Sequence, residues 1–419
     1  MATDAYTEFE WRGMVYEGTE GVREVLAREK VTCYIGFDPT ASSLHVGSLL
    51  PLMALARMQR FGHNPIAIAG GGTGMVGDPS GKTQERQLLS LEQIEENLVG
   101  IRRQLERFLD FDAPANPARI VNNADWLSKL ELMAFLRDIG KHFTINSMLA
   151  KESVKRRIES EDGLSYTEFT YSLLQAYDFL TLFDRYQCTL QLGGSDQWGN
   201  IVAGTDLIRK LRGGKAHGLV MPLVTTASGV KFGKTEAGTV WLDAARTSPY
   251  AFYQYWLHAD DRDVGTYLRW FTELDRAQIE ELDAEVAARP EAREAQRTLA
   301  RDITTRVHGA DATERAIADS AALFSGGPLV DPGQLRSVHE SAGGFTFSAE
   351  MLAAGVAVLL AEAGVLGSRG EARRMVAGGG VTVNGVRVSD PAHVPEPIAG
   401  EWLDVRIGKK RREVGRLDR

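Results

Sequence analysis

Two short stretches of the sequence combine a cation with glycine and a small hydroxyl residue. The first is His45-Val46-Gly47-Ser48, and the second is Lys231-Phe232-Gly233-Lys234-Thr235. Imidazole and ammonium groups stabilise negative charge, and glycine lets a phosphate or a flat ring approach the backbone. Both stretches are therefore candidates for handling a phosphorylated ligand. Taken singly, His45 is more typical of a capping histidine, and the lysine pair is equally typical of a solvated basic turn.

A third candidate lies in the periodic segment from Phe169 to Phe183. At about 100° per residue, one side of this helix is apolar, while Tyr171, Gln175 and Asp178 share the opposite side. The apolar side consists of Phe169, Leu173, Ala176 and Leu180. A solvated face usually mixes Lys and Glu, whereas this one carries an aromatic ring, an amide and a carboxylate. The pattern favours the wall of a cleft, with a solvated face as the alternative.

The glycine-rich stretch Gly72-x-Gly74-x-x-Gly77 has the spacing of a dinucleotide-binding fingerprint. That fingerprint places its third glycine inside a helix, but the residues after Gly77 form a turn sequence, so an NAD site is not expected. Gly81-Lys82-Thr83 resembles the end of a P-loop, but Val76 stands where the P-loop needs glycine. The stretch is otherwise typical of a long surface loop. Three of its residues could still serve a phosphate site of another kind: Asp78, Lys82 and Arg86.

The elements that must position these groups alternate between strands and helices over the first 240 residues. We expect strands at Val31–Phe37, Pro65–Ala69, Arg119–Asn122, Gln187–Leu192 and Leu219–Val224. We expect helices at Leu49–Phe61, Leu91–Leu109, Leu130–Ile139 and Phe169–Phe183. This order predicts an α/β fold with a Rossmann-like, doubly wound parallel sheet.

The rest of the chain divides into three parts. A charged, helical domain is expected over 241–325, with a helix beginning at Ser248-Pro249. Residues 326–345 are rich in turn formers and are predicted to be a flexible linker. A small α+β domain is expected over 346–419. It should contain a buried helix at 351–361, a second helix at 368–376, and a hairpin over 381–388 that turns at Asn384-Gly385.

Composition limits the class of protein. The chain has 419 residues and two cysteines far apart in sequence, so neither a disulfide framework nor a zinc cluster is expected. The longest uncharged apolar stretch has 11 residues, which is too short to cross a bilayer. We expect a cytoplasmic protein, because the acidic N-terminus shows no targeting pattern. The net charge is −8, but the segment from residue 366 onward carries +4, which favours a polyanion as its partner.

Together, the two signature stretches resemble those of class I aminoacyl-tRNA synthetases, in which both bind ATP. Other stretches are similar, in order and spacing, to the bacterial tyrosyl-tRNA synthetase family: YIGFDPTASSLHVGS, GDPSGKT, YTEFTYSLLQAYDF, LGGSDQWGN, PLVTTASGVKFGKT and SPYAFYQYW. The resemblance extends over essentially the whole chain. It departs from the usual pattern at Ser48, where a second histidine is common, so no role is assigned to residue 48.

The resemblance implies a role for each matching residue. Tyr34 and Asp178 would contact the phenolic hydroxyl of tyrosine, and Tyr171, Gln175 and Asp78 would hold its ammonium group. Gln191 and Gln197 would lie on its carboxylate side. ATP would be bound by Gly36, Asp38, His45, Gly47, Gly193, Asp196, Lys231 and Lys234. Charge on the leaving pyrophosphate would be stabilised by Thr40, His45, Lys82, Arg86, Lys231 and Lys234.

The same resemblance implies the partners L-tyrosine, ATP with its accompanying Mg²⁺, and tRNA(Tyr), and it implies a homodimer. No general base is needed, because the tyrosine carboxylate is already ionised and can itself attack the α-phosphate of ATP. The sequence shows no set of residues that would form a protein cage for the Mg²⁺. Two alternatives remain: a tryptophanyl-tRNA synthetase, and a non-catalytic RNA-binding protein with a synthetase-like body.

The basic tail has a resemblance of its own. The stretch from Ser368 to Gly385 is similar to the RNA-binding module shared by ribosomal protein S-four and pseudouridine synthases. Phosphates require cations on a rigid surface. The expected RNA contacts are Arg373, Arg374, Lys409, Lys410, Arg411 and Arg412, with a solvated basic terminus as the alternative for the last four.

Overall fold

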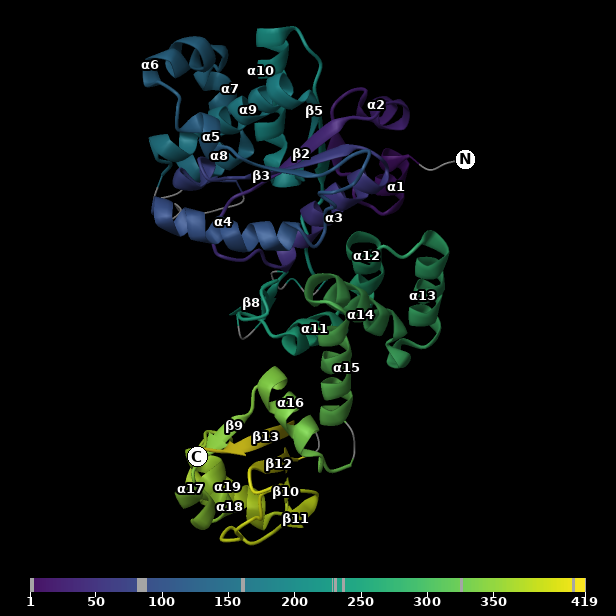
Figure 1. Ribbon diagram of the computed structural model, residues 1–419, viewed down its shortest axis with the longest axis vertical. Coiled ribbons are helices and arrows are strands. Elements are labelled where there is room, and N and C mark those ends of the chain that lie inside the picture. The colour runs from purple at the N-terminus through teal and green to yellow at the C-terminus, as the bar shows by residue number, and fades with distance from the viewer. Residues whose placement is uncertain are drawn as a thin grey trace. The chain divides into compact units, whose positions relative to one another are not determined.

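The computed structural model describes residues 4–80, 89–159, 163–227, 229, 232–235, 238–324, 327–408 and 411–418. It comprises two compact units (Figure 1). The first consists of residues 1–243 and 260–295, and the second of residues 244–259 and 296–419.

The first unit is built on a six-stranded sheet with the order β1-β6-β5-β2-β3-β4. Strands β2 to β6 are parallel, and only the short edge strand β1 is antiparallel. The strands are β1 (Glu17–Gly18), β2 (Thr32–Phe37), β3 (Asn64–Ala69), β4 (Arg119–Asn122), β5 (Cys188–Gly194) and β6 (His217–Met221). The doubly wound sheet expected from the sequence is therefore present. β6 begins two residues earlier than expected and ends at Met221.

Helices cover both faces of this sheet, which is why its central strands are almost continuously apolar. Figure 1 shows α4 on one side of β2 and β3, and α9 with α10 on the other. The helices of the first unit are α1 (Ala5–Trp11), α2 (Val22–Arg28), α3 (Leu49–Arg60), α4 (Leu91–Leu105), α5 (Ala124–Leu127), α6 (Leu132–Ala134), α7 (Ile145–Leu149), α8 (Glu152–Ile158), α9 (Tyr166–Tyr186), α10 (Trp198–Arg212), α12 (Asp261–Phe271) and α13 (Arg276–Ala288).

Short turns and a small hairpin complete the first unit. The single turns are η1 (Val46–Ser48), η2 (Thr73–Met75), η3 (Phe135–Ile139), η4 (Gly140–His142), η5 (Ser195–Gln197) and η6 (Pro290–Ala292). Strands β7 (Lys234–Thr235) and β8 (Gly238–Thr239) pair with each other. The single helix expected over Leu130–Ile139 is instead α6 followed by the π-helical turn η3.

The second unit combines helices with a five-stranded sheet of order β11-β10-β12-β13-β9. Its helices are α11 (Pro249–Leu257), α14 (Glu294–His308, from residue 296), α15 (Ala310–Phe324), α16 (Pro332–Ala342), α17 (Ala349–Ala353), α18 (Val356–Glu362) and α19 (Arg369–Ala377). Its strands are β9 (Phe345–Phe347), β10 (Val381–Val383), β11 (Val386–Val388), β12 (Trp402–Ile407) and β13 (Arg411–Leu417). The helices expected over 241–325 are thus divided, because α12 and α13 belong to the first unit.

The predicted flexible linker over 326–345 contains a helix, so that prediction is corrected. Asp331 caps α16 by accepting hydrogen bonds from the backbone N–H groups of residues 333 and 334, and Pro332 occupies the first turn. Leu335 and Val338 are buried against Trp402 and Val414 of the sheet. The turn-forming residues therefore start a helix here, because two apolar side chains three positions apart find a buried partner surface.

The apolar stretch 351–361 is also different from the expected single helix. It is divided between α17 and α18, and Gly355 at the break has φ +95°, a left-handed value that favours glycine. The hairpin over 381–388 is confirmed. Asn384 (φ 51°) and Gly385 (φ 81°) form its two-residue turn, with the positive φ values that such turns require.

Candidate active site

A cavity of about 390 Å³ opens at the carboxyl ends of β2 and β5 in the first unit. From this point the strand order runs in opposite directions, through β3 and β4 on one side and through β6 on the other. Such a switch point is where doubly wound sheets bind ligands. The wall is contributed by β2, η1, η2, α9, β5 and η5. The predicted residues that line the cavity are Tyr34, Gly36, Asp38, Thr40, His45, Gly47, Asp78, Tyr171, Gln175, Asp178, Gln191, Gly193, Asp196 and Gln197.

One part of the wall is formed by Asp178 on α9 and Tyr34 on β2, whose side chains are 3% and 1% exposed. Asp178 accepts hydrogen bonds from Asn123 Nδ2 at 2.9 Å and from Trp126 Nε1 at 2.7 Å. Burial raises the pKa of Asp178 to about 7, against the opposing effect of these two donors. The Tyr34 hydroxyl has no hydrogen-bond partner among the described residues. A ligand hydroxyl would satisfy both groups.

The pKa of the Tyr34 hydroxyl is raised well above its usual value by burial, and the neighbouring Asp178 raises it further. Tyr34 therefore stays neutral and can donate a hydrogen bond. Its ring packs edge-on against Phe179, with ring centroids 5.2 Å apart. This packing fixes the ring, so the polar group at its tip has one position relative to the cavity.

A second polar group of the wall is centred on Asp78. Gln197 Nε2 donates to Asp78 Oδ2 at 2.7 Å, and the backbone N–H of Ser80 donates to Oδ1 at 2.9 Å. Gln175 Nε2 donates in turn to Gln197 Oε1 at 3.2 Å. The structure thus joins residues from the β3–α4 loop, η5 and α9. A buried carboxylate has acceptor capacity beyond these two donors, which suits a cationic group such as an ammonium.

Tyr171 is hydrogen-bonded to a second carboxylate, that of Asp38. Burial raises the pKa of its hydroxyl, and the charges of Asp38 and Asp78 raise it further. The Tyr171 hydroxyl donates to Asp38 Oδ2 at 3.0 Å, and Thr73 Oγ1 donates to Oδ1 of the same carboxylate at 2.8 Å. Asp38, expected at the ATP side, is thus joined directly to a residue expected at the tyrosine side. Gln191 is buried on β5, and its Oε1 has no hydrogen-bond partner in the described part of the chain. The buried Gln191 amide therefore keeps hydrogen-bonding capacity for a ligand.

The first signature stretch, His45 to Ser48, forms the turn η1 directly before α3. The backbone N–H of Gly47 donates to His45 Nδ1 at 3.0 Å, and the His45 ring lies edge-on to Trp241. A Cβ added at Gly47 would come within 2.6 Å of the His45 ring, so a larger residue there would displace the ring. A Cβ added at Gly36 would meet nothing within 4 Å. The backbone at Gly36 is therefore open to the cavity, as a ring or sugar lying against it would need.

Gly193 on β5 and Asp196 on the following turn η5 also line the cavity. Burial raises the pKa of Asp196, and the nearby charge of Asp78 raises it further. In its ionised form this carboxylate can accept hydrogen bonds from a pair of hydroxyl groups. The glycine stretch from Gly72 forms only the turn η2, and Gly77 ends it at φ +84°. No helix follows Gly77 directly in the described residues up to Ser80, so the dinucleotide fingerprint is excluded as expected.

Four predicted cations are not among the described residues that line the cavity. Lys82, Arg86 and Lys231 are outside the described residues. Lys234 is exposed on β7, does not line the cavity, and donates a hydrogen bond to Thr239 Oγ1.

Some residues of the site were not predicted. They are Thr73, Asn123, Trp126, Asn200 and Trp241, of which Asn123 and Trp126 hold Asp178. Asn123 directly follows the carboxyl end of β4, so the rule that sites gather at strand ends could have identified it. Trp126 carries no such signal, because an isolated tryptophan in a sequence is more often part of the core.

In the second unit, Arg373 and Arg374 are exposed on α19, as expected for RNA contacts. The expectation for Arg412 is corrected. Its side chain is 3% exposed and donates to both carboxylate oxygens of the buried Asp404 at 2.6 and 2.7 Å. Arg411, its neighbour on β13, is half-exposed and paired with Glu413. Side chains alternate between the faces of a strand, which places only one of the two inside. Lys409 and Lys410 lie outside the described residues.

Comparison with known proteins gives the same assignment over the whole chain. A family described as "tRNA synthetases class I (W and Y)" matches residues 26–325, and the S4 domain family matches residues 355–397. The tyrosine–tRNA ligase of Roseiflexus castenholzii is 52% identical over 99% of this chain and 100% of its own. That of Geobacillus stearothermophilus is 49% identical over 97% and 98%.

A solved structure agrees with these relatives. The C-terminally truncated mitochondrial tyrosyl-tRNA synthetase of Aspergillus nidulans has a TM-score of 0.70 and 30% identity, over 77% of this chain and 94% of its own. None of the helices in the described ranges combines the length and apolar character that a membrane span requires. The similarity is thus carried by both the sequence and the fold. The chain belongs to the class I tRNA synthetases, in the family of bacterial tyrosine–tRNA ligases, and it contains an S4 domain.

Proposed function

We propose that this chain activates L-tyrosine with ATP and then transfers the tyrosyl group to tRNA(Tyr). In the first step a tyrosine carboxylate oxygen attacks the α-phosphorus of Mg²⁺-bound ATP. The bond from that phosphorus to the bridging oxygen breaks, and pyrophosphate leaves. In the second step a ribose hydroxyl of the terminal adenosine attacks the tyrosyl carbonyl carbon. The hydroxyl proton is lost and AMP leaves.

The observation that carries this proposal is the buried pair of Asp178 and Tyr34 at one part of the cavity wall. A buried acceptor and a buried donor are both costly to leave without a partner. A phenolic hydroxyl can donate to Asp178 and accept from Tyr34. The indole N–H of tryptophan can only donate, so it would leave the Tyr34 hydroxyl without an acceptor. The site therefore supports tyrosine over tryptophan.

The remaining roles follow the distribution of charge around the cavity. We assign the ammonium group of tyrosine to Asp78, Tyr171 and Gln175, and its carboxylate side to Gln191 and Gln197. The ribose is assigned to Gly193 and Asp196, and the adenine side to the open backbone near Gly36 and Gly47. Developing charge on pyrophosphate is assigned to Thr40, His45, Lys82, Arg86, Lys231 and Lys234. Groups aimed at this charge stabilise the transition state more than the ground state.

We assign tRNA binding to the helices of the second unit and the S4 domain. Arg373 and Arg374 are exposed there, and residues 366–419 carry a net charge of +4. The domain limits 1–240, 241–325 and 346–419 remain part of this proposal, with α16 in the connecting segment. We propose a cytoplasmic location, in keeping with a role in translation.

A homodimer is proposed from the first unit. Large apolar side chains are exposed on consecutive elements from α6 to the start of α9, and α6, α7 and α8 lie together in Figure 1. They are Leu132, Met133, Leu136, Ile145, Leu149, Ile158 and Tyr166, of which Met133 is 75% exposed. Exposed apolar side chains of this number mark an interaction surface. Sedimentation of the Met133→Asp variant tests it: a monomer is expected, and an unchanged dimer would refute this assignment.

Charging of tRNA(Tyr) with labelled amino acids tests the proposed function. We expect tyrosyl-tRNA to form and tryptophanyl-tRNA not to form under the same conditions. RNA binding without any charging would instead support the alternative of a non-catalytic RNA-binding protein.

A further inference from the structure

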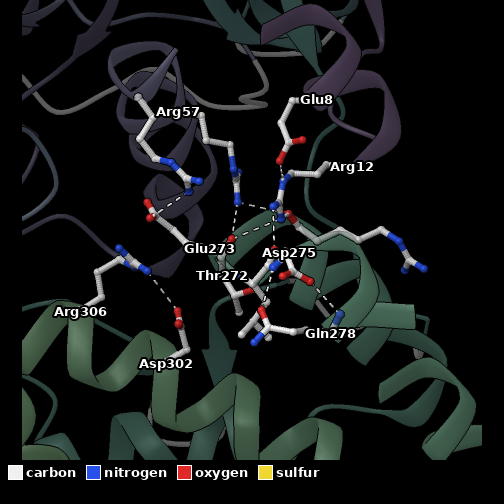
Figure 2. Close-up of polar contacts among 12 residues, drawn as sticks. Glu8, Arg12, Arg57, Thr272, Glu273, Asp275, Gln278, Asp302 and Arg306 are labelled. Atoms are coloured by element: carbon white, nitrogen blue, oxygen red, sulfur yellow. Dashed lines mark hydrogen bonds and ion pairs between the residues drawn. The ribbon is translucent and has the colours of Figure 1, made fainter. Parts of the chain in front are cut away.

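Two buried arginines meet at the C-terminal end of α12. Arg57 donates to the carbonyl oxygens of Trp270 at 2.8 Å and Thr272 at 2.6 Å. Arg12 donates to the carbonyl oxygens of Arg269 at 2.9 Å and Leu274 at 2.8 Å (Figure 2). The last carbonyls of a helix lack partners within the helix and carry its negative dipole end. Two guanidinium groups therefore fix this end of α12.

Arg57 lies on α3, the helix that directly follows His45 and the turn η1. Its side chain is almost completely buried, and it crosses directly to the carbonyls at the end of α12. On the next turn of α3, Arg60 pairs with Glu273 at 3.0 Å. The position of α12 is thus set by α3, the helix that follows the first signature stretch.

The same helix contacts the second signature. The Phe232 ring is stacked on that of Phe271, with centroids 5.8 Å apart and planes inclined by 12°. It also lies edge-on to Tyr267, with centroids 5.5 Å apart. We call Tyr267 and Phe271 the aromatic seat. Both side chains are buried on α12, so Phe232 rests on a surface that is fixed in position.

Further contacts hold the chain just before the second signature stretch, at residues 225 and 227. The Tyr267 hydroxyl donates to the carbonyl oxygen of Thr225 at 3.3 Å, and the backbone N–H of Ala227 donates to the Asp263 carboxylate at 3.0 Å. On the other side, a Cβ added at Gly233 would come within 2.8 Å of Val46 in the first signature. Phe232 and Gly233 are therefore enclosed between α12 and the turn that begins α3.

Lys234 follows two residues after Phe232 along the chain. Its own side chain is exposed and donates a hydrogen bond to Thr239 on the adjacent strand β8. Its distance from the cavity therefore depends on how its backbone is held. The Phe232 ring, two residues earlier, ties this backbone to α12, and the Gly233 carbonyl accepts a hydrogen bond from the backbone N–H of Val240 at 3.0 Å.

We propose that the aromatic seat positions Lys234 for its action on ATP, by holding Phe232 against α12. The seat residues touch neither ATP nor tyrosine, so they are positioning residues. This inference rests on the proposed function, because it concerns the step in which pyrophosphate leaves. A cation misplaced by about 1 Å loses much of its effect on a transition state, whereas tyrosine binding occurs elsewhere in the cavity.

The test uses the full-length protein with Phe232→Leu and Phe271→Leu. Phe232 is half-buried, so its replacement leaves the fold intact even if that of Phe271 does not. We expect the single-turnover rate of tyrosyl adenylate formation to fall about 3- to 10-fold in each variant, as removal of an aromatic pair predicts. The dissociation constant of tyrosine should stay unchanged. The double variant should be no slower than either single variant, because both remove the same contact.

Two variants serve as controls. Phe271→Tyr keeps the ring and should keep most of the rate. Phe252→Leu removes an equally buried ring in the second unit, where it packs against Trp256 and His308, and should leave adenylate formation unchanged.

The proposal is overturned if Phe232→Leu and Phe271→Leu form adenylate at the wild-type rate. It is also overturned if tyrosine affinity falls in both variants by the same factor as the rate of adenylate formation. A double variant whose loss of rate equals the product of the two single losses would overturn it as well. A wild-type protein that forms no tyrosyl adenylate would refute the proposed function itself, which is a different result.

Discussion

The indole nitrogen of Trp126 lies 2.7 Å from Oδ1 of Asp178 and donates a hydrogen bond to this buried carboxylate. The Asn123 amide donates to the other oxygen at 2.9 Å. An ionised carboxylate has acceptor positions for about four hydrogen bonds, so Asp178 can still accept one from a ligand. The two donors thus fix the orientation of the acceptor without using all of its capacity.

The first prediction concerns amino-acid selection. Replacing Asp178 with Ala should abolish the advantage of tyrosine over phenylalanine, because phenylalanine then leaves no buried acceptor unpaired. Tyrosyl-tRNA synthetases are themselves the usual illustration of this kind of selection, so we predict only the direction. The ratio of kcat/KM for the two amino acids measures it. If the Asp178→Ala variant keeps an undiminished preference for tyrosine, Asp178 does not bind the substrate hydroxyl.

The second prediction concerns the pH dependence of stability. Burial raises the pKa of Asp178 to about 7 in the folded protein, whereas an unfolded aspartate titrates near its ordinary value of about 3.9. Between these values the folded state binds more protons than the unfolded state, so the Asp178 contribution to stability falls as pH rises.

Chemical denaturation of the wild type and of Asp178→Asn at pH 4.5 and pH 7.5 measures this contribution. The free energy of unfolding of the wild type, relative to the variant, should decrease with pH, by roughly 1 kcal/mol for each unit of pKa shift. A difference that stays constant or grows over this range would contradict the raised pKa.

The third prediction concerns the cations of the second signature. Lys234→Ala should lower the rate of adenylate formation on the order of 100-fold, as removal of one group aimed at developing charge does. The dissociation constant of tyrosine should change little. Lys30→Ala, which removes an exposed lysine of the same unit away from the cavity, is the matched control. Equal losses of rate and of tyrosine affinity in Lys234→Ala would indicate a structural role instead.

The fourth prediction separates two kinds of arginine in the S4 domain. Reversing charge at Arg373 and Arg374 should weaken tRNA binding and make it less dependent on salt. The slope of the logarithm of the binding constant against the logarithm of the salt concentration should decrease in magnitude by about 0.7 to 0.9 for each phosphate that the variant no longer neutralises. Tyrosyl adenylate formation should be unaffected. If tRNA affinity and its salt slope are those of the wild type, α19 is not the RNA-binding helix.

Arg412 should behave in the opposite way. Its replacement by Ala leaves the fully buried Asp404 without its charge partner, which costs about 3 to 5 kcal/mol in comparable buried pairs. The second unit should therefore unfold at a lower temperature or at a lower denaturant concentration than in the wild type. A stable Arg412→Ala variant with weakened tRNA binding would restore Arg412 to the RNA surface.

Much of the fold follows from patterns visible in the sequence. Strand β4 lies where it was expected, because a short apolar run between turn formers has few alternatives. The hairpin at Asn384-Gly385 is specified by residues that accept positive φ. Helix α16 could not be predicted, because its stability comes from packing against Trp402 and Val414, which lie far away in sequence.

The candidate site shows the same division. The face of α9 that carries Tyr171, Gln175 and Asp178 follows from helical periodicity, and all three line the cavity. The burial of Arg412 could not be inferred, because its partner Asp404 lies on a neighbouring strand. Only strand register decides which of two adjacent arginines faces inward.

The most direct test of this account is ATP–pyrophosphate exchange by the purified full-length protein, without tRNA, in the presence of each amino acid in turn. The account predicts exchange that depends on tyrosine and that neither tryptophan nor phenylalanine supports at the same concentration. Exchange driven by tryptophan, or no exchange with any amino acid, would contradict the assignment of Asp178 and Tyr34 to a tyrosine-activating site.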